Sequence, residues 1–116
     1  MVADTYGMSN LRRTPVYSLL STESDLDESI HLFVIGLAEQ VDLLQDDEQN
    51  SDFEGLEERA AVLAGHADRM GYPDLARVVQ KVADSCSEEM KGAVQKGLVQ
   101  VTEIARCIRL GHRGSA

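Results

Sequence analysis

The side chains best suited to chemistry in this chain are three histidines and two cysteines. These residues are His31, His66, His112, Cys86 and Cys107. They are widely spaced, and they form neither a CxxC pair nor a His, Cys and Asp cluster of the kind that binds zinc. We therefore expect no metal site and no cofactor. Both cysteines are interpreted as buried, reduced thiols, and the spacing gives no support to the alternatives, a disulfide or a redox switch.

Length and charge exclude several function classes. The 116 residues predict one domain, and 11 basic against 20 acidic residues give a net charge of −9. Such a charge repels nucleic acids and anionic membranes. The negative charge favours a partner with a basic surface. It is explained equally well if the acidic surface only keeps the protein soluble. The N-terminus carries no secretory pattern and no apolar run reaches membrane-spanning length, so we expect a cytoplasmic protein.

Apolar residues recur every three or four positions in four segments, which predicts amphipathic helices. Low aromatic content also favours helices over a β-sandwich. The four stripes are Leu26, Ile30, Phe33, Leu37, Val41 and Leu44; Phe53, Leu56, Ala60, Leu63, Ala67 and Met70; Leu75, Val79, Val82 and Cys86; and Met90, Val94, Gly97, Val101, Ile104 and Ile108. The fold class is therefore all-α, an antiparallel up-down four-helix bundle with a short N-terminal extension.

Residues at the helix ends divide the chain further. Residues 1–14 are predicted to form a flexible arm, 15–111 the bundle and 112–116 a tail. Within 15–20, Val16, Leu19 and Leu20 are expected to dock on the bundle. The expected caps of the helices are Thr22 or Ser24, then Ser51 with Glu54, then Pro73 at a helix start, then Ser85 or Ser87. Gly71 and Gly111 are the expected helix stops, and 45–50 is expected to be a polar loop that begins as the first helix fades.

The second helix carries an unusual outer flank. If its apolar stripe faces inward, the flank consists of Glu57, Ala61, Ala64, Gly65 and Asp68. Two alanines and a glycine leave a bare patch where long charged side chains are common. A glycine inside a helix costs about 1 kcal/mol relative to alanine. It either leaves room for a ring or a partner beside position 61, or allows a neighbouring helix to pack closely, and spacing does not separate these explanations.

The same segment resembles the signature of histidine-phosphotransfer (HPt) domains. In that family a histidine is followed three residues later by lysine, then by glycine, and further on by glycine and an aromatic residue. This chain has Leu63, Gly65, Gly71 and Tyr72 in the matching places, and the likeness extends over about residues 15–90. The resemblance implies a helical bundle whose exposed histidine exchanges phosphoryl groups with receiver-domain aspartates.

Two departures from this pattern remove the chemistry. Ala61 stands at the histidine position and Ala64 at the lysine position. Phosphoryl transfer needs a nucleophile and positive charge near the transferred group, and two methyl groups supply neither. We therefore expect no catalytic residue here. The loss of both residues favours natural divergence over a single engineered change.

These observations predict a non-catalytic HPt-like module that docks a receiver domain or a histidine kinase, as a monomer or weak homodimer. The expected docking face is the flank formed by Glu57, Ala61, Ala64, Gly65 and Asp68. The alternatives are a phosphotransfer protein that uses His66 and a structural, self-associating bundle. His66 lies five residues after Ala61, about 140° around the helix, so it does not occupy the same place. A structural or surface role for His66 is the stronger interpretation.

Overall fold

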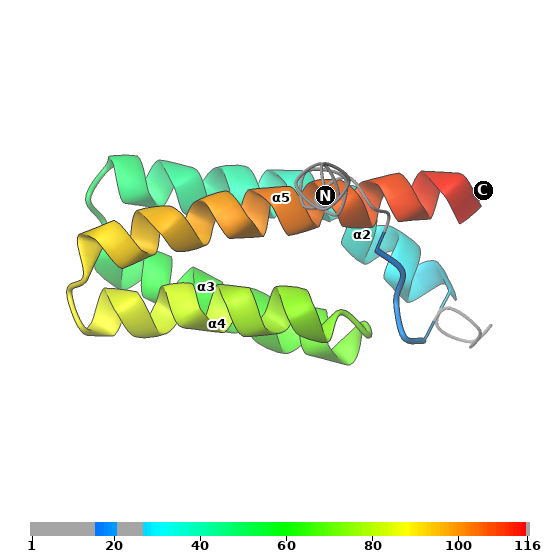
Figure 1. Cartoon of the computed structure of the whole chain (residues 1–116), viewed down its shortest axis with the longest axis horizontal. Helices are drawn as coiled ribbons and strands as arrows, with labels where there is room; N and C mark the ends of the chain where they lie inside the picture. Colours follow the sequence, from blue (N-terminus) through cyan, green and yellow to red (C-terminus); the bar gives the residue numbers. More distant parts are fainter. Residues whose placement is uncertain (1–15, 21–26, 116) are drawn as a thin grey trace, which may run out of the picture.

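The computed structural model describes residues 16–20 and 27–115 of the chain. Within these ranges the secondary structure consists of four helices and no strand: α2 (Asp27–Gln49), α3 (Phe53–Arg69), α4 (Pro73–Ser87) and α5 (Lys91–Ser115). Neighbouring helices run antiparallel, and α2 closes the ring by packing against α5 (Figure 1). The predicted up-down four-helix bundle is confirmed. The expected arm, residues 1–14, and the cap residues Thr22 and Ser24 lie outside the described residues.

The four predicted stripes meet in one core. Every stripe residue that the structure describes is buried except Phe53, Met70 and Ile104, which are partly buried, and Met90. Met90 is 51% exposed because it lies in the α4–α5 turn, one position before α5 begins. Its expected core position is therefore wrong, and the stripe of α5 starts at Val94.

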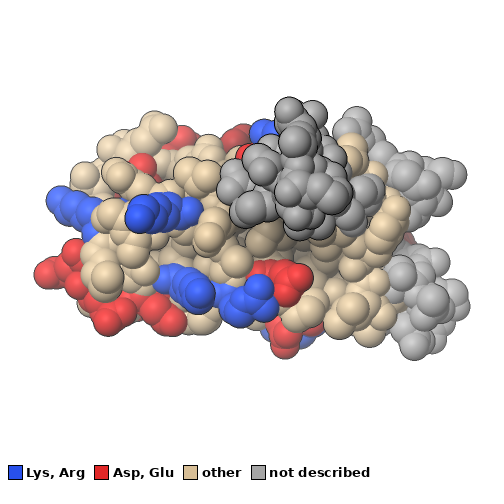
Figure 2. Space-filling model, in the orientation of Figure 1, with Lys and Arg blue, Asp and Glu red and all other residues tan. Residues whose placement is uncertain are grey.

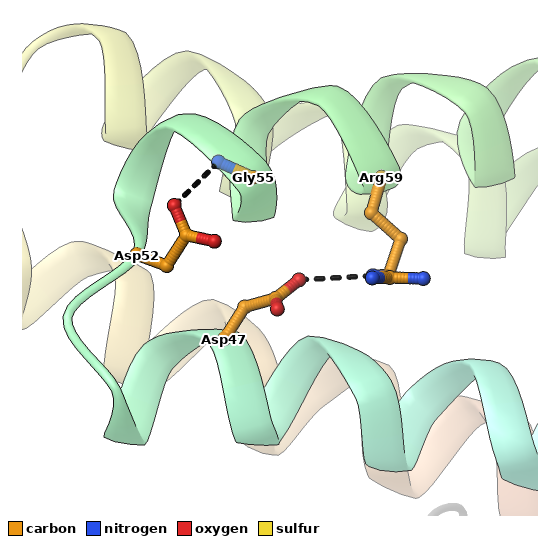
Figure 3. Close-up of polar contacts among 4 residues, drawn as sticks. All are labelled: Asp47, Asp52, Gly55 and Arg59. Atoms are coloured by element: carbon orange, nitrogen blue, oxygen red, sulfur yellow. Dashed lines mark hydrogen bonds and ion pairs between the residues drawn. The ribbon is translucent and has the colours of Figure 1, made fainter.

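The connection between α2 and α3 differs from the expected capping box. The cap is Asp52, whose carboxylate accepts a hydrogen bond from the Gly55 N–H at 3.0 Å (Figure 3). Ser51, the expected cap, adopts a positive φ of 58° in the turn. The acidic residues 46–48 belong to the last turns of α2 and not to a loop. Among them, Asp47 pairs with Arg59 of α3 at 2.9 Å and so joins the two helices.

The turn between α3 and α4 forms as predicted. Gly71 has a φ of +86°, a conformation that favours glycine, and Pro73 is the first residue of α4. Residues 16–20, drawn in blue in Figure 1, run from α5 to this turn. Ser18 is buried and donates a hydrogen bond to the Met70 carbonyl at 2.5 Å, and the Leu19 N–H donates to the Gly71 carbonyl at 2.8 Å.

The entry segment docks through two of its three predicted side chains. Val16 and Leu20 pack against the core, whereas Leu19 is 73% exposed, so its expected docking is wrong. The Val16 N–H donates to the Cys107 carbonyl of α5 at 2.9 Å. A Cβ on Gly111 would lie 2.5 Å from the Val16 oxygen. This glycine thus permits close contact between the entry segment and α5.

Two helix boundaries on the C-terminal side need correction. The third predicted helix, α4, continues to Ser87, and residues 88–90 form the turn before α5. Neither Ser85 nor Ser87 therefore caps the fourth predicted helix, α5. Helix α5 does not end at Gly111 but continues to Ser115. A glycine inside a helix lowers helix stability by only about 1 kcal/mol relative to alanine, so α5 can continue through Gly111. The absence of a side chain at Gly111 also leaves room for the entry segment, residues 16–20.

Candidate docking surface

The outer flank of α3 is only partly the bare face that spacing predicts. Ala61 and Asp68 are exposed and Gly65 is partly exposed, but Ala64 is only 5% exposed. Ala64 lies at the edge of the contact with α4, because the small side chains of α3 let α4 approach closely. Glu57 is also engaged by α4, since its carboxylate accepts a hydrogen bond from the Ser87 hydroxyl. The predicted exposure of Ala64 is therefore wrong.

Gly65 has no packing function within the described structure. A Cβ built there would contact only the Nη1 atom of Arg69, at 3.5 Å, an ordinary van der Waals distance. Gly97 of α5 is the opposite case, because its Cβ would lie 2.6 Å from the Cγ2 atom of Val82 in α4. Close packing of a neighbouring helix therefore explains Gly97 and does not explain Gly65.

Substituting these two glycines should change stability in opposite directions. Gly65→Ala should raise the free energy of unfolding by about 0.5–1 kcal/mol, because alanine is the better helix residue and nothing obstructs its methyl group. Gly97→Ala should lower it by about 1–3 kcal/mol through overpacking against Val82. Urea denaturation followed by circular dichroism measures both. If both substitutions changed the free energy of unfolding in the same direction, this explanation of Gly65 would be wrong.

A groove between α2 and α3 adjoins this face. It has a volume of about 570 Å³ and is lined by Leu32, Phe33, Gly36, Glu39, Gln40, Gly55, Glu58, Arg59, Val62, Leu63 and His66. Leu32 and Val62 are 61% and 68% exposed. Ile35, one turn after Leu32 on α2, is also 61% exposed. Exposed aliphatic side chains that line a groove, as Leu32 and Val62 do, are typical of a protein interaction site.

The α2 part of this surface was not identified from the sequence, although a signal was present. Leu32 and Ile35 are large apolar residues that fall off the buried stripe of α2 and lie three positions apart. Residues at this spacing share a helix face. A second, shorter apolar stripe on α2 therefore marks the side that faces away from the core.

His66 lies on the groove side of α3, whereas Ala61 does not line the groove. The exposed His66 ring makes a T-shaped contact with Phe33, with ring centroids 4.8 Å apart, and Phe33 stacks on Tyr72 at 5.8 Å. The two positions thus face different directions, as the helical geometry predicts. His66 packs against an aromatic side chain while one side of its ring stays accessible.

The charged side chains at the groove are mostly acidic. Glu39 and Glu58 line it, while Arg59 is held by Asp47 in a partly exposed ion pair. Such an ion pair contributes at most about 1 kcal/mol to stability. The Asp47 carboxylate nevertheless offsets the charge of Arg59, the one Lys or Arg among the groove-lining residues. Figure 2 shows a different face, formed mainly by α4 and α5, where acidic and basic side chains are interspersed. The α2–α3 groove therefore combines an apolar rim with negative charge.

The cysteines offer no nucleophile near this surface. Both are buried, as predicted. Burial, followed by the negative charge of Glu57, raises the pKa of the Cys86 thiol to about 11, and burial also raises the pKa of Cys107. A thiol with a raised pKa stays protonated at neutral pH and reacts slowly. Among the described residues, no three His, Cys, Asp or Glu side chains gather in a group that could hold a metal ion between them.

No family model matches the chain, and no curated protein or solved structure matches it significantly. The likeness to HPt domains therefore depends only on the sequence pattern, chiefly in α3 and the turn that follows it. A shared bundle fold does not by itself assign a function. None of the four described helices has the length and apolarity needed to cross a bilayer.

Proposed function

We propose that this chain is a non-catalytic, HPt-like signalling module that docks a receiver domain or a histidine kinase of a two-component phosphorelay without carrying phosphate. The observation that carries the proposal is the exposed methyl group of Ala61, one turn from a glycine that the packing does not require. A methyl group accepts no phosphoryl group. The space beside it remains open to a partner.

The contact surface consists of Leu32, Ile35, Ala61, Val62 and Gly65. Its three large aliphatic side chains are each more than half exposed, so burying them against a partner removes apolar area from water. Ala61 and Gly65 add little bulk, which lets a partner approach the α3 backbone. The acidic groups beside the groove favour a partner that surrounds its apolar contact with lysine or arginine.

The docking experiment substitutes Val62, which at 68% is the most exposed of the three large aliphatic residues on this surface. Val62→Glu should weaken binding of a receiver domain by about 30-fold or more, as expected for loss of a contact worth ~2 kcal/mol. Isothermal titration against purified receiver domains from the same organism measures the effect. The expected result is a clear loss of affinity with an unchanged circular dichroism spectrum.

Val99→Glu provides the matched control. Val99 is 62% exposed on α5, close to the 68% of Val62, so the same substitution tests a different face. It should leave receiver binding unchanged. Equal losses in both variants would show that added negative charge, and not the α2–α3 surface, determines binding. A stable homodimer that Val62→Glu dissociates would instead favour the self-associating bundle.

The alternative phosphotransfer function through His66 makes a different prediction. His66 is exposed, which such a function requires, but its ring packs against Phe33, and Arg59, which lines the same groove, is paired with Asp47. Acid-labile phosphate on the wild-type chain that His66→Ala removes would support this alternative. It would contradict the proposed docking module, which carries no phosphate.

A further inference from the structure

Two histidines that are 81 residues apart in the sequence meet between α2 and α5. The Nδ1 atom of His31 lies 2.7 Å from the Nε2 atom of His112, and the ring centroids are 4.9 Å apart. His112 reaches this place because α5 continues past Gly111. His31 is exposed and His112 is partly exposed, so ions in solvent have access to both rings.

Two imidazole nitrogens at this distance have two chemical uses. In a neutral ring one nitrogen carries a proton and the other carries a lone pair, so the rings either share a proton or direct both lone pairs at a common atom. Neutral imidazole is a preferred ligand for zinc, nickel and copper ions. Calcium and magnesium prefer oxygen ligands and are not suited to this pair.

We propose that His31 and His112 bind a divalent transition-metal ion of the zinc class, through Nδ1 and Nε2, with water at the remaining coordination positions. Two nitrogens that are each about 2.0–2.1 Å from a tetrahedral zinc ion lie about 3.3–3.4 Å apart. The observed 2.7 Å must therefore widen by only about 0.6–0.7 Å. Small rotations of two accessible side chains provide this change without moving the helices.

The surrounding charges favour a cation at this place. His112 lies in the last turn of α5, where the helix dipole is negative. One turn before His31 and His112 lie residues of opposite charge, Glu28 and Arg109, so the nearest helix neighbours add no net positive charge. The net charge of −9 adds a general attraction for cations.

A bound ion would join the first part of α2 to the last part of α5. Neither histidine lines the α2–α3 groove, although His31 adjoins Leu32 and lies one turn before Ile35 of the proposed docking surface. The two proposals are independent, and either one can fail without the other.

The test titrates ZnCl₂ into tag-free, reduced protein in a buffer that does not chelate zinc, by isothermal titration calorimetry. Wild type should bind one equivalent saturably. His31→Ala and His112→Ala should each weaken binding by about tenfold or more, because even the loss of a group that only supports a ligand costs 10–100-fold. Both positions are accessible, so circular dichroism should show that the variants fold.

The third histidine of the chain supplies the matched control. His66→Ala should bind zinc as wild type does, because His66 packs on Phe33 and is not part of the pair. Absence of saturable binding to wild type would overturn the proposal. It would also be overturned if His66→Ala lost binding as strongly as the other variants, or if only one of His31→Ala and His112→Ala lost it. Those results would leave a hydrogen bond between two neutral rings.

Discussion

The double substitution Ala61→His and Ala64→Lys is expected to convert a chain that accepts no phosphate into one that accepts it from a phosphorylated receiver domain. Position 61 is exposed, so a new imidazole there reaches solvent and a docked partner. A lysine at position 64 would start at a buried Cβ. Its stem can follow the shallow hollow between α3 and α4, beside Asp68, Ala76 and Gln80, and bring its ammonium group to the surface.

Radiolabelled phosphoryl transfer to the double variant measures this gain of function. The single variant Ala61→His should accept phosphate more slowly, because the positive charge that stabilises the transferred group is missing. Ala64→Lys alone should accept none. A folded double variant that receives no phosphate from any receiver domain it binds would show that bound receivers do not approach position 61.

Leu37→Ala should produce the largest loss of stability of the substitutions considered. Leu37 is completely buried in the middle of α2, and such leucine-to-alanine changes lower the free energy of unfolding by about 2.7–5 kcal/mol. Part of the loss is the transfer free energy of the removed carbon atoms, and part is the cavity that remains. Thermal and urea denaturation measure the change.

Leu32→Ala is the matched control on the same helix. Leu32 is 61% exposed, so this variant should change stability by no more than about 0.5 kcal/mol. It should instead weaken receiver binding, because Leu32 belongs to the proposed contact surface. Comparable destabilisation by the two variants would mean that Leu32 contributes to the core and is not a docking residue.

The bundle was predictable because apolar spacing directly reports which side of each helix faces the core. The helix ends were less predictable, because several nearby residues suit the same turn. Ser51 and Asp52 are both good caps, and local geometry selects Asp52. Gly111 resembles a helix stop, but contact with Val16 accounts for this glycine inside a continuing helix.

The candidate surface was predictable on α3 and not on α2. Ala61 and Gly65 could be identified by their small size on an outer flank. Ala64 could not be placed, because the packing of α4 against α3 decides which small residue is covered. The sequence also could not predict contacts between distant segments. Examples are Val62 and Leu32, which line one groove, and His31, which lies beside His112. Such pairs depend on how the helices pack.

The most direct test follows complex formation and label transfer together, with wild-type protein and radiolabelled, phosphorylated receiver domains. We expect a complex with at least one receiver domain while no label moves to this chain. Label on the chain that acid removes and that His66→Ala abolishes would contradict it. Failure of every receiver domain and histidine kinase from the organism to bind would contradict it as well.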